Sequence, residues 1–133
     1  MKITFKPIGY VRNPHSDVPR HWSVSDLEGE LDILPEYGVG LADIVVGQQI
    51  IVLFHFDRSE LFKAEHLKQK KRHKNEIKGV FSICSPIRPN PIGFSVVTVL
   101  AIEGGSIRVR GLDMFDGTPI LDIKPHTEDK RVE

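Results

Sequence analysis

The chain has 133 residues, which is enough for one domain whose hydrophobic core needs no disulfide or metal to hold it together. It carries 18 basic and 18 acidic side chains and a single cysteine, which excludes an internal disulfide and argues against strong indiscriminate binding to nucleic acid. No apolar run approaches the roughly 20 residues of a membrane-spanning helix, and the N-terminus does not have the pattern of a signal peptide. We therefore expect one domain over residues 1–133, located in the cytoplasm and without a membrane partner.

The first half of the chain predicts three strands. Residues 3–11 form the first, with Pro7 marking an edge or a bend, and residues 28–34 alternate between apolar and polar side chains in the manner of a half-buried strand. Residues 35–46 are expected to contain a short helical turn that begins at Pro35. Residues 49–56 form a nearly continuous apolar run, which predicts a strand covered on both sides.

Polar side chains flank these strands. Trp22, in the loop after the first strand, either stacks on a purine or caps the core. His55 ends the apolar run, where a hydrogen-bonded structural role is the commoner one. A polar excursion over residues 59–76 follows, and its first four residues suggest a short helix.

The excursion is strongly basic. Residues 63–78 contain seven of the 18 Lys and Arg side chains and two Glu side chains. Such a stretch is either a contact surface for phosphate groups or a solvated loop.

The segment from residue 79 to residue 97 contains three prolines within six positions, Pro86, Pro89 and Pro91. Each fixes its own φ near −65° and pushes the preceding residue towards an extended conformation. Arg88 and Asn90 are therefore presented with little conformational freedom. This stiff bend either holds a ligand or simply joins two strands, with Arg88 in solvent or paired to a carboxylate at the edge of the core.

The second half predicts further strands over residues 94–102, 107–112 and 118–124, with turns at residues 103–106 and 116–117. At least six strands and little helix indicate an all-β fold, a small β-barrel with one or two short helices. Strands that are apolar on both faces also suggest that an outer surface meets a second copy, which predicts a homodimer.

No metal site is predicted, because the six His residues are scattered and no zinc-ligand cluster occurs. Catalytic-triad spacing, a P-loop and a dinucleotide-binding glycine motif are also missing from the sequence.

Two long motifs carry a resemblance to a known family. R-P-N-P-I-G-F-S, preceded by G-V-F-S, and D-G-T-P-I-L-D-I-K-P resemble the TsaA-like, or TrmO, family of small β-barrel methyltransferases. P-I-G-Y-V-R-N-P, V-P-R-H and the apolar run before His55 extend the resemblance over nearly the whole chain. It implies S-adenosylmethionine as cofactor and tRNA as substrate, with methylation of the exocyclic nitrogen of N-threonylcarbamoyladenosine beside the anticodon.

The resemblance also implies roles for individual residues. Expected cofactor contacts are His21, Trp22, Ser23, Asp57, Arg58, Cys84, Val96, Phe115, Asp116, Gly117 and Thr118. Arg88 and Asp122 are expected in catalysis, and Asn90, Lys124, Lys70, Lys71 and Arg72 on the substrate side.

Methyl transfer needs a nucleophile held in line with the methyl group, about 3 to 3.5 Å away, in a water-poor pocket. The carbamoyl group makes the exocyclic N–H more acidic, and Asp122 or Asp116 is a candidate acceptor for its proton.

The sequence departs from the family pattern in two places. Cys84 stands where the family usually has arginine, and it is either a change in the site or a small buried apolar filler. The sequence stops at Glu133, without the C-terminal extension of bacterial members. A methyltransferase of the same fold acting on a small molecule therefore remains an alternative, as does a barrel that binds the cofactor or RNA without catalysis.

Overall fold

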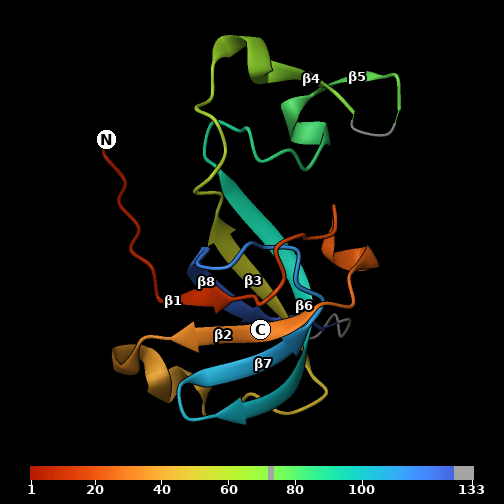
Figure 1. The fold of residues 1–133 in the computed structure, drawn as a ribbon. Coiled ribbons are helices and arrows are strands. Elements are labelled where there is room, and N and C mark those ends of the chain that lie inside the picture. Colours follow the sequence, from red (N-terminus) through yellow and green to blue (C-terminus); the bar gives the residue numbers. More distant parts are fainter. Residues whose placement is uncertain (72–73, 128–133) are drawn as a thin grey trace.

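The computed structural model describes residues 1–71 and 74–127. Six strands form a closed barrel in which every neighbouring pair is antiparallel (Figure 1). In order around the barrel the strands are β1 (Gly9–Arg12), β2 (Glu28–Ile33), β7 (Ser106–Arg110), β6 (Ile92–Glu103), β3 (Gln49–His55) and β8 (Pro119–Pro125). The predicted small all-β barrel is confirmed.

The helical elements of the described residues are short 3-10 helices: η1 (Trp22–Val24), η2 (Pro35–Leu41), η3 (Ala64–Leu67) and η4 (Val80–Ser82). Pro35 opens η2 as predicted, because its fixed φ suits the first helical position and no partner is lost with its missing N–H. The helix predicted after Ser59 is wrong: η3 begins at Ala64, where His66 Nδ1 accepts a 2.9 Å hydrogen bond from the backbone N–H of Lys63. Within residues 1–71 and 74–127, no helix has the length and apolar character needed to cross a bilayer.

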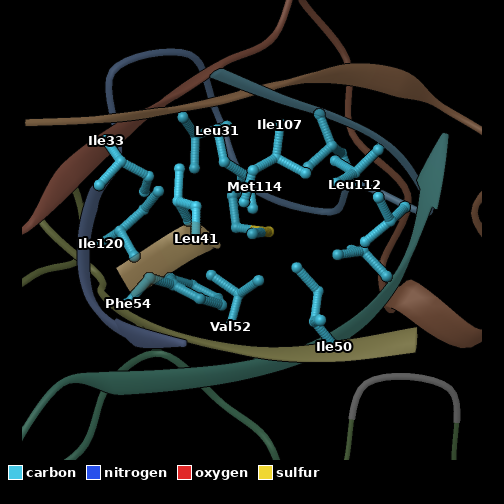
Figure 2. Packing of buried hydrophobic residues seen from close by; sticks show 14 residues of the cluster. Leu31, Ile33, Leu41, Ile50, Val52, Phe54, Ile107, Leu112, Met114 and Ile120 are labelled. Carbon is cyan, nitrogen blue, oxygen red and sulfur yellow. The ribbon is translucent and has the colours of Figure 1, made fainter. Parts of the chain in front are cut away.

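The core fills the inside of the barrel, and Figure 2 shows its side chains pointing inward from all sides. Alternation along β7 places Ile107 and Val109 inside and Arg108 and Arg110 outside, as the sequence predicted. Each fully buried Leu or Ile side chain contributes about 1.5–3 kcal/mol. The cluster comprises Val11, Leu31, Ile33, Leu41, Ile50, Val52, Phe54, Val97, Val99, Ile107, Val109, Leu112, Met114 and Ile120.

Two strands differ from expectation. The first begins at Gly9 rather than at residue 3, because Pro7 has no N–H for a ladder, and Figure 1 shows the preceding segment extending away from the barrel. β3 is not covered on both sides: its inward residues are buried, whereas Ile51 and Leu53 on the outer face stay partly exposed. In a closed barrel each strand has one face towards the core and one face outside. The apolar residues of β3 are therefore fully buried on the inner face only.

The excursion between β3 and β6 stands beyond one end of the barrel (Figure 1). It contains a two-stranded antiparallel sheet, β4 (Lys68–Lys70) with β5 (Ile77–Gly79), which the sequence did not predict. The Gln69 side-chain amide donates a 2.9 Å hydrogen bond to the carbonyl of Ile87. The small sheet is therefore tied to the proline bend.

Gly93 and Phe54 face each other across β6 and β3, and a Cβ added to Gly93 would lie 2.2 Å from Phe54 Cζ. We expect Gly93→Ala to lower the unfolding free energy by about 1–3 kcal/mol, the usual cost of overpacking a core. Urea titration followed by tryptophan fluorescence measures the change.

Gly38→Ala is the matched control, because a Cβ at Gly38 meets nothing within 4 Å. Equal stability of Gly93→Ala and wild type would show that the Phe54 ring is free to move aside.

Candidate functional site

A hollow of about 670 Å³ opens at the end of the barrel where β3 finishes and β6 begins. Three further segments border it: the loop before η1, the proline bend, and the loop between β7 and β8. Its volume lies within the range of small-molecule and cofactor sites.

Aromatic rings line much of this hollow. Phe54 and Phe56 meet edge to face with centroids 5.0 Å apart, and the rings of His21 and Trp22 lie 4.9 Å apart. Phe94 and Phe115 are 51% and 42% exposed, which leaves ring surface open to a planar ligand.

Three arginines add positive charge: Arg20, Arg58 and Arg88. The guanidinium of Arg58 donates to the carbonyl of Asp116 and lies 5.2 Å from the centroid of the Phe115 ring. The guanidinium of Arg88 donates to the carbonyls of Ile83 (2.8 Å) and Ser85 (3.2 Å), so this side chain braces the proline bend from inside.

The loop between β7 and β8 is held by several hydrogen bonds. The backbone N–H and the side-chain amide of Asn13 donate to Asp116 Oδ1 and to the carbonyl of Met114, both at 2.9 Å. The hydroxyl of Ser25 donates to the carbonyl of Leu112. Gly117, with φ +82°, turns the chain into β8 in a conformation that residues with side chains rarely adopt. The loop therefore presents Asp113, Phe115 and Thr118 to the hollow in fixed positions.

The sequence did not single out Asp113. Its Oδ1 accepts a 2.5 Å hydrogen bond from the hydroxyl of Ser95, a residue of β6 with no solvent exposure. Burial raises the pKa of Asp113 above the usual 3.8, and the opposing effects of Ser95, the charge of His21 and two backbone N–H groups do not cancel it. The signal was Ser95 itself, one of the few polar residues in the largely apolar strand β6, because a polar residue on the buried face implies a polar partner.

Trp22 also lines the hollow, and its indole N–H is buried without a hydrogen-bond partner among the described residues. A buried donor left unpaired costs about 1–3 kcal/mol. An acceptor atom on a bound ligand would remove that cost.

Most of the residues that the resemblance singled out for the cofactor lie together. His21, Trp22, Asp57, Arg58, Cys84, Phe115 and Thr118 line the hollow, as does Arg88. Ser23, Asp116 and Gly117 adjoin lining residues, with Ser23 Oγ 2.7 Å from His21 Nδ1, and Val96 is buried within β6. Cys84 is exposed, so its interpretation as a buried filler is wrong.

Asp122, expected in catalysis, and the residues expected on the substrate side are dispersed. Asp122 and Lys124 line a second hollow of about 580 Å³, beside η2 at the start of β3, where Asp122 Oδ2 and Lys124 Nζ lie 3.0 Å apart. Asn90 is exposed outside the first hollow, Lys70 and Lys71 are exposed on the excursion, and Arg72 lies outside the described residues. Catalytic and substrate roles for these residues remain predictions.

No group of three or more His, Cys, Asp or Glu side chains that could hold a metal ion occurs in residues 1–71 and 74–127. The hollow instead combines aromatic rings, guanidinium groups and two carboxyl groups, which suits an organic ligand with a planar ring and charged ends.

A closed barrel with such a hollow at one end belongs to the class of small ligand-binding β-barrels. Residues 11–130 match the model of the tRNA-methyltransferase O N-terminal domain, and the chain belongs to this family.

Relatives and solved structures agree with this assignment. A probable S-adenosyl-L-methionine-binding protein of Pyrococcus abyssi is 40% identical over 133 residues, covering 95% of this chain and 69% of the relative. An S-adenosyl-L-methionine-binding protein of Archaeoglobus fulgidus is 40% identical over 128 residues, covering 94% and 90%. The crystal structure of TrmO from P. aeruginosa superimposes with a TM-score of 0.77 and 29% identity over 99% of this chain and 58% of that one. The chain therefore spans little more than half of the TrmO chain.

Proposed function

We propose that this protein is an S-adenosylmethionine-dependent methyltransferase whose cofactor binds in the hollow at the end of β3. The observation that carries the proposal is the convergence in that hollow of residues from five chain segments that the family motifs point to. Two relatives of comparable length are named as an S-adenosyl-L-methionine-binding protein and a probable S-adenosyl-L-methionine-binding protein, which supports this choice of cofactor.

The residues present fit this cofactor. Exposed ring faces on Phe94 and Phe115 suit the adenine, and the guanidinium of Arg58 suits the carboxylate of the methionine moiety. The unpaired indole N–H of Trp22 would gain an acceptor. When bound, the cofactor supplies a methyl group activated by the positive charge on sulfur. The chain's own residues hold the reactants and keep water out.

We further propose that the methyl acceptor is the exocyclic nitrogen of N-threonylcarbamoyladenosine beside the tRNA anticodon, which would place the reaction in the cytoplasm. The support is the family motif and a mouse tRNA (adenine(37)-N6)-methyltransferase, 42% identical over 80 residues, covering 60% of this chain and 18% of that protein. The basic side chains on β4 and β5 stand next to the proline bend, where they could contact the RNA backbone.

Calorimetric titration with S-adenosylmethionine tests the cofactor site. We expect Arg58→Ala to weaken binding by about 10- to 150-fold, since loss of a charge-assisted hydrogen bond costs about 1.5–3 kcal/mol. Arg108→Ala removes another exposed arginine, paired with Glu28 on the outside of the barrel, and should bind normally. Wild-type protein that binds no cofactor would refute the proposal. Binding without labelled-methyl transfer to any RNA would indicate a non-catalytic barrel.

Salt dependence tests the tRNA contact. Replacing Lys70 and Lys71 by Ser should weaken tRNA binding and reduce the slope of log K against log salt by about 0.7–0.9 per charge removed. Lys2→Ser with Lys6→Ser removes two exposed charges from the N-terminal segment as the control. Unchanged binding, together with methyl transfer to a small molecule, would favour the small-molecule alternative.

We also propose a homodimer that covers the excursion. Leu61, on the excursion, and Phe81, in η4 directly after β5, are 84% and 80% exposed. Burial of such apolar surface favours association. Sedimentation should show a dimer for wild type and a monomer for Phe81→Asp. Val39→Asp, at an equally exposed position in η2, is the control. A monomeric wild type would refute this proposal.

A further inference from the structure

We propose that Asp113 accepts the proton that the substrate nitrogen loses during methyl transfer, an inference that rests on the function proposed above. The role requires a carboxyl group inside the hollow, fixed in position and shielded from water. Its oxygen must also be able to take up a proton near neutral pH.

Two of the described residues that line the hollow carry carboxyl groups, Asp57 and Asp113. Asp57 is exposed at the mouth, directly after the residues that end β3. Asp113 is partly buried, on the loop between β7 and β8. A proton acceptor for a reaction that must exclude water is better provided by the more buried of the two groups.

The position of the Asp113 carboxyl group is fixed by Ser95, whose hydroxyl donates to it from the wall of the barrel at 2.5 Å. The backbone N–H groups of Trp22 and of Asp113 itself lower its pKa, although less than burial raises it. Ser95 is fully buried in β6, so it cannot turn away to solvent. The carboxyl group is thus preorganised on rigid elements, as a group that acts in a transition state should be.

The environment of Asp113 makes it a stronger base than an ordinary carboxylate. Burial raises its pKa, while His21 is the nearby ionisable group whose charge lowers it. The other ionisable side chains among the described residues that line the hollow are Arg20, His55, Asp57, Arg58, Cys84 and Arg88. General-base catalysis is most efficient when the pKa of the base lies close to the working pH, so the shift is in the useful direction.

The two carboxyl groups considered from the sequence are less suitable. Asp116 Oδ1 accepts the backbone N–H of Asn13, and Asp116 does not line the hollow. Asp122 pairs with Lys124 and lines the second hollow, not the first. Asp113 alone combines burial, fixed orientation and access to the first hollow within the described residues.

The step balances without another reactant. The bond between the substrate nitrogen and the methyl carbon forms, and the bond between methyl carbon and sulfur breaks with its electron pair remaining on sulfur. The proton on the nitrogen moves to the carboxylate of Asp113. The positive charge on sulfur and the negative charge on Asp113 are both lost, which favours the step in a poorly solvated site.

Asp113→Asn tests the inference, because the asparagine oxygen still accepts the Ser95 hydroxyl but cannot take a proton. We expect calorimetry to give an affinity for S-adenosylmethionine within about threefold of wild type, and the single-turnover rate on threonylcarbamoylated tRNA to fall by about 100-fold or more. The wild-type rate should rise with pH as Asp113 loses its proton. That rise should be absent from the variant.

Stability provides a readout that does not depend on turnover. Because the pKa of Asp113 is raised in the folded state, the folded protein binds this proton more tightly than the unfolded chain. The unfolding free energy of wild type, relative to Asp113→Asn, should therefore decrease as pH rises above 3.8 through the folded-state pKa. Urea titrations of both proteins at several pH values measure this difference.

Asp32→Asn is the matched control, since Asp32 also accepts a serine hydroxyl, that of Ser106 at 3.0 Å, on the outer face of the barrel. It should retain both the wild-type rate and its rise with pH. An Asp113→Asn protein that turns over at the wild-type rate would overturn the inference. So would a loss of affinity equal to the loss of rate, which would mean that Asp113 anchors the loop or binds the cofactor. Absence of methyl transfer by wild type would instead refute the proposed function, and the inference with it.

Discussion

The contact between Phe54 and Gly93 joins the core of this barrel to its site. Phe54 is 3% exposed and belongs to the hydrophobic cluster, yet its ring also lines the hollow, and it fits there because Gly93 opposite has no side chain. Met114 likewise belongs to both. Side chains of the hydrophobic core therefore also form the base of the hollow. Because the core is packed at the density of a protein interior, these side chains do not move when a ligand binds, and the site rests on a rigid part of the molecule.

The walls of the hollow come from loops far apart in the sequence, and polar contacts bring them together. Asn13, near the N-terminus, donates hydrogen bonds to Met114 and Asp116, and Ser25 donates one to Leu112. Arg58, after β3, reaches the same loop through the carbonyl of Asp116 and the Phe115 ring. A register shift in the pairing of β3 with β8 lies between Leu53 and Phe54, close to this corner, where such irregularities commonly aim side chains into a site. The barrel sets the distances between the loops that form the hollow, and the contacts between these loops set the orientation of the side chains that line it.

The chain also separates its chemistry between two hollows. Aromatic rings and guanidinium groups gather at the end that carries the excursion, whereas the Asp122–Lys124 pair sits in the second hollow beside η2. Arg88 both lines the first hollow and holds the carbonyls of Ile83 and Ser85, so the prolines and the arginine stiffen the bend together. Gln69 then couples that bend to the basic two-stranded sheet. A net charge of zero is compatible with a local basic surface because residues 63–78 hold seven of the 18 basic side chains and only two acidic ones. The lysines among the described residues of this range are all exposed.

Local patterns were sufficient for part of this structure. Alternation predicted β2 and β7, paired turn residues predicted the connections at Gly104 and Gly117, and Pro35 marked the start of η2, because each feature depends on the geometry of neighbouring residues. The motifs also identified His21, Trp22, Arg58 and Phe115, which the structure brings to one hollow. Closure of the barrel decided the rest. It left the outer face of β3 half-exposed, and it sent Asp122 to a different hollow from Arg88 although both lie in family motifs. It also placed a partly buried Asp113 against Ser95, a pairing across 18 residues that no local pattern contains. Such burial, and the raised pKa that follows from it, arises only when distant strands pack together.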